Sequence, residues 1–159
     1  MLHIHILAVG KLGQDWLAEG CAHYRQLIAP YFKLQITELP AHRLPGSPSA
    51  AQIEQALAAE GELIRAKVPK GGFAIALCPE GQAFSSPGFS SLLERCAGQG
   101  QPPVFVIGSS HGLCPTIKKQ AQLSLSLSGM TFPHQLARLL LLEQIYRGGC
   151  ILCGGKYHK

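Results

Sequence analysis

The fold is decided by two short apolar stretches, FAIALC at residues 73–78 and VFVI at residues 104–107. Both stretches are continuous rather than alternating, which is typical of strands in a parallel sheet that is covered by helices on both faces. Three further segments of strand length lie at residues 3–9, 32–39 and 123–127. These segments predict the strands of one sheet.

Segments with apolar residues at helical spacing separate the strands. The predicted helices cover residues 14–28, 50–67, 86–98, 115–120 and 133–148. Ser49 followed by Gln52 is the capping-box pattern that opens the second of them. Strands and helices that alternate in this way are typical of an α/β fold. We therefore predict a single domain over residues 1–159, with a mostly parallel sheet and helices on both of its faces.

The composition excludes several classes of protein. The 159 residues are 47% hydrophobic and 14% charged, which favours a packed core over disorder. Only nine residues are acidic and Asp15 is the single aspartate, so carboxylate-rich metal centres are excluded. The net charge of +5 lies within residues 110–159, because acidic and basic residues are equal in number over residues 1–109. This asymmetry favours an anionic partner such as a phosphate backbone, with a merely solubilising surface as the alternative.

Nothing in the sequence directs the chain to a membrane. Residues 1–9 are apolar but lack the basic start of a signal peptide, and no apolar stretch approaches the roughly 20 residues of a span. Six cysteines in a chain of this size suit a reducing compartment, so we expect a cytoplasmic protein. Cys150 and Cys153 have no second pair at a suitable spacing, so we interpret them as reduced thiols and expect no metal.

Three polar or glycine-rich turns are predicted after the later strands, at residues 79–81, 108–112 and 128–131. In open α/β sheets ligands bind beyond the carboxyl ends of the strands, where glycines such as Gly108 and Gly112 let the backbone approach. We therefore predict a small-molecule pocket at these turns, the alternative being tight turns without a ligand.

The turn after the first strand is different. Gly10–Gly13 lacks the G-x-G-x-x-G spacing of dinucleotide-binding domains, so Glu38 has no fingerprint beside it to act as a ribose-binding acid. This counts against an NAD enzyme.

The predicted helix at residues 133–148 is apolar around most of its circumference. Such a helix must be covered on more than one side. We expect a second copy of the chain to supply the cover, with a central helix inside a monomer as the alternative. Glu143 and Arg147 are four residues apart and are expected to pair.

Histidines and a basic tail supply candidates for proton transfer. His111 and His134 flank the predicted pocket, and imidazole titrates near neutral pH. The tail KYHK at residues 156–159 combines two cations, an aromatic ring and an imidazole. Folded over a pocket, it would hold a phosphate and move a proton.

Several motifs together resemble one known family. They are LAVGK (7–11), FVIGSSHGL (105–113), LSLSGMTFPHQLAR (125–138), EQIYR (143–147) and the terminal KYHK (156–159). The family is RlmH, the ribosomal RNA large subunit methyltransferase H of bacteria, in the SPOUT superfamily, and the resemblance covers the whole chain. Ser109 is a departure, because the family usually has a second glycine there, and its side chain would narrow the approach to the ligand.

The resemblance implies a C-terminal trefoil knot, which spacing alone would not predict. It also implies that S-adenosylmethionine lies bent within the knot and that the protein is a homodimer through the knot and helix 133–148. With Gly112 of the same turn, the expected cofactor-binding residues are Leu77, Gly108, Gly112, Leu127, Ser128, Gly129, Met130, Thr131 and Phe132.

The reaction that the resemblance implies is methyl transfer to N3 of a pseudouridine in 23S rRNA, in helix 69 of the assembled ribosome. Arg147, with Lys156 and Lys159, would favour a deprotonated imide. The candidates that accept or relay its proton are His158, Tyr157 and His134. A non-catalytic basic RNA-binding module is the alternative from another class, and a Rossmann-type nucleotide enzyme is a further rival.

Overall fold

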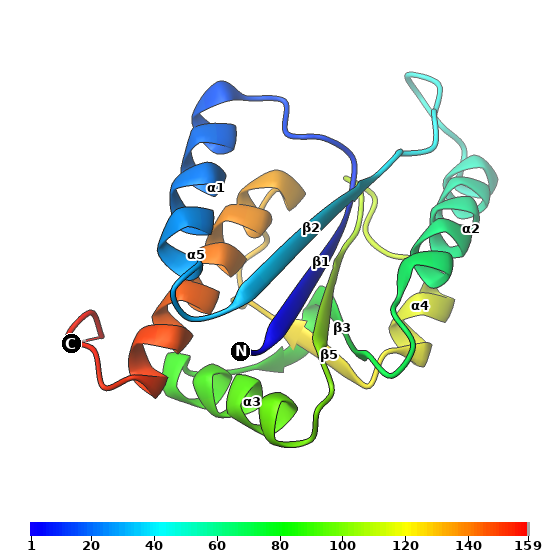
Figure 1. Ribbon diagram of the computed structural model, residues 1–159. Helices are drawn as coiled ribbons and strands as arrows, with labels where there is room; N and C mark the ends of the chain where they lie inside the picture. Colours follow the sequence, from blue (N-terminus) through cyan, green and yellow to red (C-terminus); the bar gives the residue numbers. More distant parts are fainter. Residues whose placement is uncertain (159) are drawn as a thin grey trace.

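The computed structural model describes residues 1–158 as a five-stranded sheet with five helices (Figure 1). In chain order the elements are β1 (His3–Val9), α1 (Asp15–Ile28), β2 (Lys33–Leu39), α2 (Ala50–Lys67), β3 (Phe73–Ala83), α3 (Ser86–Gly98), β4 (Pro103–Ile107), α4 (Pro115–Gln120), β5 (Leu123–Ser126) and α5 (His134–Leu152). The predicted capping box is present, since Gln52 N donates to Ser49 Oγ and Ser49 N donates to Gln52 Oε1.

The strands are ordered β2-β1-β4-β3-β5, and every neighbouring pair is parallel. The prediction of an α/β fold with a mostly parallel sheet is confirmed. Because all strands run the same way, their carboxyl ends meet at one edge of the sheet. The loops after β1 to β5 therefore lie on the same side of the molecule.

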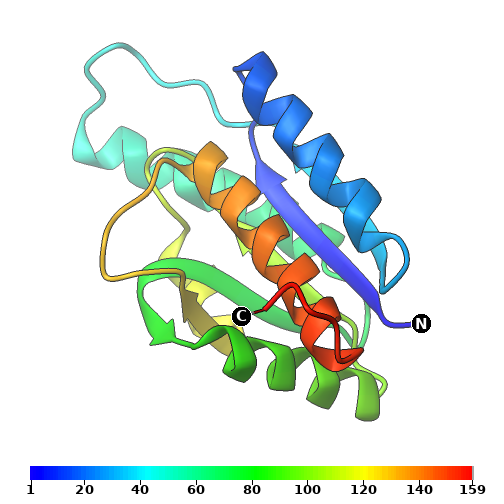
Figure 2. The same cartoon turned by 90° about the vertical axis from the view of Figure 1, so that its left-hand side faces the viewer.

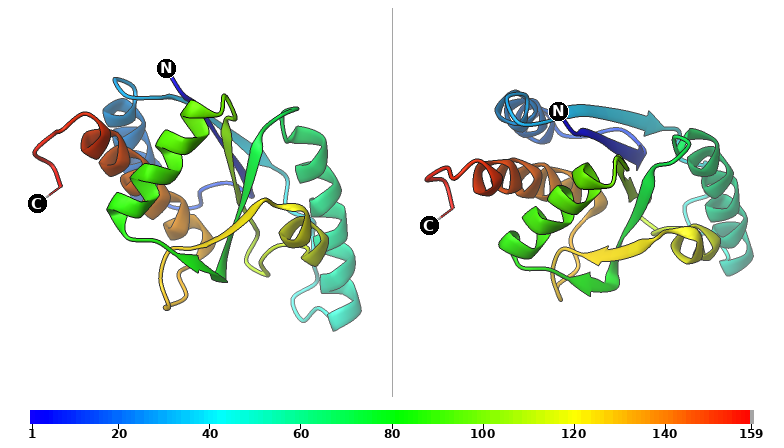
Figure 3. Two further views of the ribbon diagram at one scale, coloured as in Figure 1. Left: turned by 90° about the horizontal axis from the view of Figure 1, so that it is seen from below. Right: turned by 60° about the horizontal axis from the view of Figure 1, so that its bottom comes forward.

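Two layers of helices cover the sheet, as predicted. Helices α1, α3 and α5 lie on one face, with α5 between the other two, and α2 and α4 lie on the other face (Figures 2 and 3). The strands alternate accordingly. In β4, Phe105 packs into the core beneath α1, α3 and α5, whereas Val104 and Val106 pack against Ile64 and Ile117 of the opposite layer.

The expected turn at residues 79–81 is wrong, because β3 runs on to Ala83. The pairing of β3 with β5 breaks after Leu77 and resumes at Gln82, so the residues between them form a bulge. Pro79 has no N–H to donate to a ladder, which accounts for the break. Gly81 lets the strand return, because a Cβ there would lie 2.7 Å from the backbone nitrogen of Leu125.

Helix α5 ends four residues later than predicted, at Leu152 rather than Gly148. Gly148 and Gly149 continue the helix and lie close to side chains of neighbouring elements. A Cβ at Gly149 would lie 2.7 Å from Cγ of Tyr31, and one at Gly148 would lie 3.0 Å from a methyl group of Leu93. The two glycines thus allow α5 to pack closely on its neighbours.

The apolar circumference of α5 is largely covered within one chain. Leu141, Leu142 and Ile145 are fully buried, and Leu139 contacts α1 at Gly20. Leu136 and Leu140 stay partly exposed. Burial against α1, α3 and the sheet therefore accounts for most of the pattern, and the homodimer stays a prediction, as does the trefoil knot. No helix within residues 1–158 is both long and apolar enough to cross a membrane.

Candidate functional site

A cavity of about 690 Å³ lies at the carboxyl ends of β3, β4 and β5, beside the first turn of α5. Its wall is formed by Leu77, Cys78, Pro79, Ile107, Gly108, Ser109, Ser110, Gly112, Leu125, Leu127, Ser128, Met130, Thr131, Phe132, Pro133, His134 and Ala137. The cavity is where the parallel sheet was expected to hold a ligand, and its size suits a small molecule.

The structure brings most of the predicted cofactor-binding residues to this wall. Eight of the nine lie on it: Leu77, Gly108, Gly112, Leu127, Ser128, Met130, Thr131 and Phe132. Gly129 is exposed and is absent from the wall. His134 also lies on the wall, whereas His111 is exposed, with Nδ1 of its ring 3.3 Å from Ser110 Oγ. The assignment of a cofactor to these residues stays a prediction.

The turn at residues 108–112 requires both of its glycines. A Cβ on Gly108 would lie 2.2 Å from the carbonyl oxygen of Gly112, and Gly112 itself has a φ of +87°. Gly112 N donates to the carbonyl oxygen of Ser109 at 2.9 Å, which closes the turn. The turn is thus a tight, backbone-lined wall of the cavity.

His134 begins α5 at the cavity wall and is partly buried. Burial lowers the pKa of the imidazole below its usual value, and the nearby Arg138 guanidinium lowers it further, while Glu60 acts in the opposite direction. The imidazole is therefore neutral near pH 7 and is able to accept a proton at the cavity.

Arg138 is a buried cation, one turn after His134 on α5 and 3% exposed. It pairs with Glu38 at 2.6 Å and donates to the carbonyl oxygen of Gly10 at 3.0 Å. Its Nε has no partner within residues 1–158. Glu38 is thus engaged in an ion pair that holds the ends of β1 and β2 on α5.

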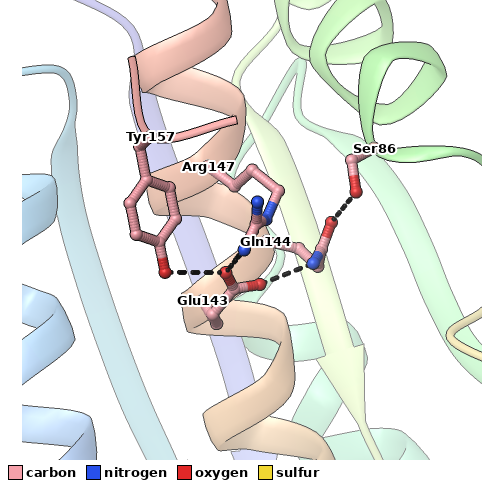
Figure 4. A network of polar contacts seen from close by, with 5 residues as sticks. All are labelled: Ser86, Glu143, Gln144, Arg147 and Tyr157. Atoms are coloured by element: carbon pink, nitrogen blue, oxygen red, sulfur yellow. Dashed lines mark hydrogen bonds and ion pairs between the residues drawn. The ribbon is translucent and has the colours of Figure 1, made fainter. Parts of the chain in front are cut away.

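Two of the other predicted catalytic residues, Arg147 and Tyr157, lie toward the far end of α5 (Figure 4). Glu143 Oε1 accepts from Arg147 Nε and Nη2, at 3.0 and 2.6 Å, and from the Tyr157 hydroxyl at 3.1 Å. The Arg147 guanidinium lies 4.5 Å from the centre of the Tyr157 ring. The predicted pairing of Glu143 with Arg147 is therefore present, and the tail folds back along the helix.

This network continues toward α3 (Figure 4). Gln144 Nε2 donates to Glu143 Oε2 at 2.5 Å, and Ser86 Oγ donates to Gln144 Oε1 at 2.7 Å. Glu143, Gln144 and Ser86 line a smaller cavity of about 270 Å³, which shares Leu127 and Phe132 with the large one.

Two ionisation states at the tail follow from these contacts. Partial burial, together with hydrogen bonds to Tyr24 and Glu143, raises the pKa of Tyr157 to about 12. Glu143 likewise raises the pKa of Arg147. Tyr157 therefore keeps its proton at neutral pH and donates a hydrogen bond to Glu143, and its part in proton transfer stays a prediction.

Arg147, Tyr157 and His158 do not line the large cavity of their own chain. His134 and Arg147 are 13 residues apart on α5, which separates them by about 20 Å along the helix axis. His158 and Lys156 are exposed, and Lys159 lies outside the described residues. Within one chain, the predicted cofactor site and most of the predicted catalytic residues are thus apart.

Sequence reasoning missed two charged residues of the site, Glu60 and Arg138. Both are buried although they are ionisable, and no pattern in a single sequence reports burial of a charge. The one available signal for Arg138 is its position four residues after His134 on an apolar helix.

Metal-ligand geometry is absent from the described part of the chain. Within residues 1–158 no three His, Cys, Asp or Glu side chains are grouped so that they would hold a metal ion. Cys150 is buried and Cys153 is exposed.

Comparison with known proteins identifies the family. The family model described as "Predicted SPOUT methyltransferase" matches residues 2–158. The chain is 42% identical to the ribosomal RNA large subunit methyltransferase H of Leuconostoc mesenteroides, over 99% of this chain and 100% of that protein. It is also 42% identical to the protein of the same name from Moorella thermoacetica, over 100% of both.

A solved structure supports the fold. A methylase family protein from Neisseria gonorrhoeae superposes with a TM-score of 0.51 at 11% identity, covering 91% of this chain and 80% of that one. The resemblance found in the motifs is confirmed by the sequence relatives. The chain belongs to the SPOUT methyltransferase family and, within it, to the ribosomal RNA large subunit methyltransferases.

Proposed function

We propose that the chain uses S-adenosylmethionine to methylate N3 of a pseudouridine in 23S rRNA, in helix 69 of the assembled ribosome. The observation that carries the proposal is the cavity at the strand ends, whose wall contains eight of the nine residues expected to bind the donor. Ribosomes as substrate place the protein in the cytoplasm.

The cavity fits a donor of this kind. Its volume of about 690 Å³ falls within the usual range for small-molecule sites, roughly 300–1,000 Å³. The Gly108–Gly112 turn forms a backbone-lined part of the wall, and it is so tight that a Cβ on Gly108 would collide with the carbonyl group of Gly112. Leu77, Leu127 and Phe132 supply apolar contacts. When bound, the sulfonium supplies an already activated methyl group, so the protein's task is to align the reactants.

The nitrogen that is methylated must lose its proton. Methylation at N3 replaces the N3–H bond of the imide, so a residue of the site must accept that proton. The neutral imidazole of His134 lies on the cavity wall and accepts this proton. The guanidinium of Arg147 favours the deprotonated imide, and the Tyr157 hydroxyl donates a hydrogen bond to Glu143, which keeps Arg147 in place.

The separation along α5 favours a homodimer in which each site draws on both chains. The cavity of one chain is completed by Arg147, Tyr157 and His158 of a second copy, packed through the C-terminal region and α5. The partly exposed Leu136 and Leu140 on α5 supply an apolar surface for that contact. The net charge of +5 lies within residues 110–159, which suits a partner that presents rRNA phosphates.

Tritium transfer from labelled S-adenosylmethionine tests the reaction. We expect label in whole ribosomes and little in stripped rRNA, and none in ribosomes that carry uridine in place of the pseudouridine. Calorimetric titration with the donor separates the enzyme from a non-catalytic RNA-binding module, which gives no heat. Absence of both heat and transfer would refute the proposal.

Mixed dimers test the shared site. One chain carries Gly108→Ala, which damages the cavity, and the other carries Tyr157→Ala with His158→Ala, which damages the tail. Each homodimer should be inactive, whereas the mixed dimer has one intact site and about half of the wild-type rate. An inactive mixed dimer would mean that each chain uses its own tail. Should His158→Ala alone leave turnover unchanged across pH, His158 has no part in the mechanism.

A further inference from the structure

Glu60 is a buried carboxylate whose role the reaction does not explain. It lies on α2, is 4% exposed, and forms no ion pair with a lysine or arginine of residues 1–158. Buried carboxylates are costly unless their oxygens are hydrogen-bonded or paired. Its two oxygens must therefore be satisfied by neutral donors.

The two oxygens accept hydrogen bonds from two different segments. Glu60 Oε2 accepts from Ser109 Oγ at 3.0 Å, and Glu60 Oε1 accepts from the backbone N–H of His42 at 3.0 Å. Ser109 belongs to the turn at residues 108–112, which forms one wall of the large cavity. His42 belongs to the loop at residues 40–49, which connects β2 to α2.

Both α2 and the turn at residues 108–112 are closely packed around the contact between Glu60 and Ser109. Gly61, the next residue on α2, packs against Cys114, and a Cβ there would lie 3.2 Å from Cys114 Cβ. The turn itself is tight, because Gly108 lies against the carbonyl group of Gly112. A shift of Ser109 is therefore transmitted to the cavity wall rather than absorbed within the turn.

The loop at residues 40–49 lies on the substrate side of the molecule. It leaves the carboxyl end of β2, and the cavity lies at the carboxyl ends of β3, β4 and β5, so both are at one edge of the parallel sheet (Figures 1 and 2). His42 and Arg43 are exposed on this loop. Their position suits contact with the phosphates of an RNA substrate.

We propose that Glu60 is a positioning residue that ties the loop at residues 40–49, which carries Arg43, to the donor-binding turn through its two carboxylate oxygens. The inference rests on the proposed function, because it assigns the donor to the large cavity and RNA to the loop. Fixing Ser109 keeps the turn in the shape that binds the donor, and fixing His42 holds the loop against the same side chain. Binding of the donor at the turn then changes the affinity of the loop for RNA, and binding of RNA changes the affinity for the donor by the same factor.

Three variants and a control separate this role from a general effect on folding. Ser109→Ala removes one hydrogen bond, and Glu60→Ala removes both. Glu60→Gln keeps both, because its amide oxygen accepts from His42 N and its amide nitrogen donates to Ser109 Oγ. Glu54→Ala, at an exposed position on the same helix, is the matched control.

Calorimetry with S-adenosylmethionine gives the first readout. We expect Ser109→Ala and Glu60→Ala each to raise the Kd about tenfold, as for loss of a hydrogen bond to a charged group. The double variant Ser109→Ala/Glu60→Ala should have about the same Kd as Glu60→Ala alone. The Kd of Glu60→Gln should stay within about threefold of the wild-type value, and that of Glu54→Ala should equal the wild-type value.

Hydrogen exchange gives the second readout, which a merely structural role would not move. In the wild type, saturating donor should slow amide exchange at His42 and its neighbours by about tenfold, and in Ser109→Ala this response should vanish although the variant is folded. Unchanged donor affinity in folded Ser109→Ala, or additive effects in the double variant, would overturn the inference. If the wild type binds no donor at all, the proposed function itself fails, which is a distinct outcome.

Discussion

Replacing Gly108 by alanine should block the cavity wall while leaving the rest of the fold intact. The new Cβ would lie 2.2 Å from the carbonyl oxygen of Gly112 and 2.5 Å from its carbon. An ordinary contact begins near 3.4 Å, so the turn must open by about 1.2 Å. Because the displaced atoms are backbone, rotation of a side chain cannot relieve the overlap.

The cost follows from this displacement. Overpacking of this kind typically lowers the free energy of unfolding by about 1–3 kcal/mol, and about 2 kcal/mol corresponds to a fall in Tm of roughly 4–8 °C for a chain of this size. A misplacement of about 1 Å at a binding wall typically reduces the rate about 100-fold. We therefore expect Gly108→Ala to bind the donor at least tenfold more weakly and to methylate ribosomes about 100-fold more slowly.

Gly129→Ala is the matched control for this experiment. A Cβ at Gly129 meets no atom within 4 Å, its φ is not positive, and the residue is absent from the cavity wall. Its Tm and donor affinity should therefore match those of the wild type. The reasoning is refuted if Gly108→Ala binds the donor normally, or if Gly129→Ala is impaired to the same degree.

Three further outcomes are expected. The pKa of His134 is lowered by burial and by Arg138, so the imidazole binds a proton more readily in the unfolded chain than in the folded one. The free energy of unfolding should therefore fall as the pH drops below about 6.5 toward the lowered pKa. Urea unfolding of His134→Asn should show a smaller loss over this pH range, and an imidazole that titrates at or above 6.5 by NMR contradicts this. Glu38→Gln leaves the buried Arg138 cation without its charged partner. It should cost about 1–2 kcal/mol, less than for a fully buried pair, because Glu38 is itself 38% exposed. An unchanged Tm argues against the pair. Gly149→Ala brings a Cβ to 2.7 Å from Cγ of Tyr31 and should lower the free energy of unfolding by about 1–3 kcal/mol. The Kd for the donor should stay within about twofold of wild type. A large loss of donor affinity would show that this end of α5 is coupled to the cavity.

Local signals placed most of the elements correctly from the sequence. The capping box at Ser49 fixed the start of α2 to the residue, and the continuous apolar run at β4 identified a strand buried on both faces. Both signals depend on neighbours in the chain. The two errors at β3 and α5 arise from contacts between segments that are distant in the chain. In the sequence, Gly81 and Gly149 are typical of a turn and a helix end, but in the structure they allow close packing against β5 and Tyr31.

The candidate site was predictable in part for a similar reason. The rule that ligands bind at strand ends located the turn at Gly108, and the motifs located the segment up to Phe132. Neither source reported that α5 separates Arg147 from the cavity, since that depends on the direction in which the helix leaves the sheet. Nor did they reveal Glu60, whose partners lie 18 and 49 residues away in the chain.

The order in which the chain is synthesised has a consequence for when the protein becomes active. Strand β5, inserted beside β3, and the first turn of α5 supply a large share of the cavity wall, and both come from residues after 122. A nascent or truncated chain that ends before them contains four strands of the sheet but only part of the pocket. Under the proposed function, the capacity to hold a methyl donor therefore arises late, because the docking of distant segments is intrinsically slow. Donor binding is for this reason a sensitive reporter of complete folding.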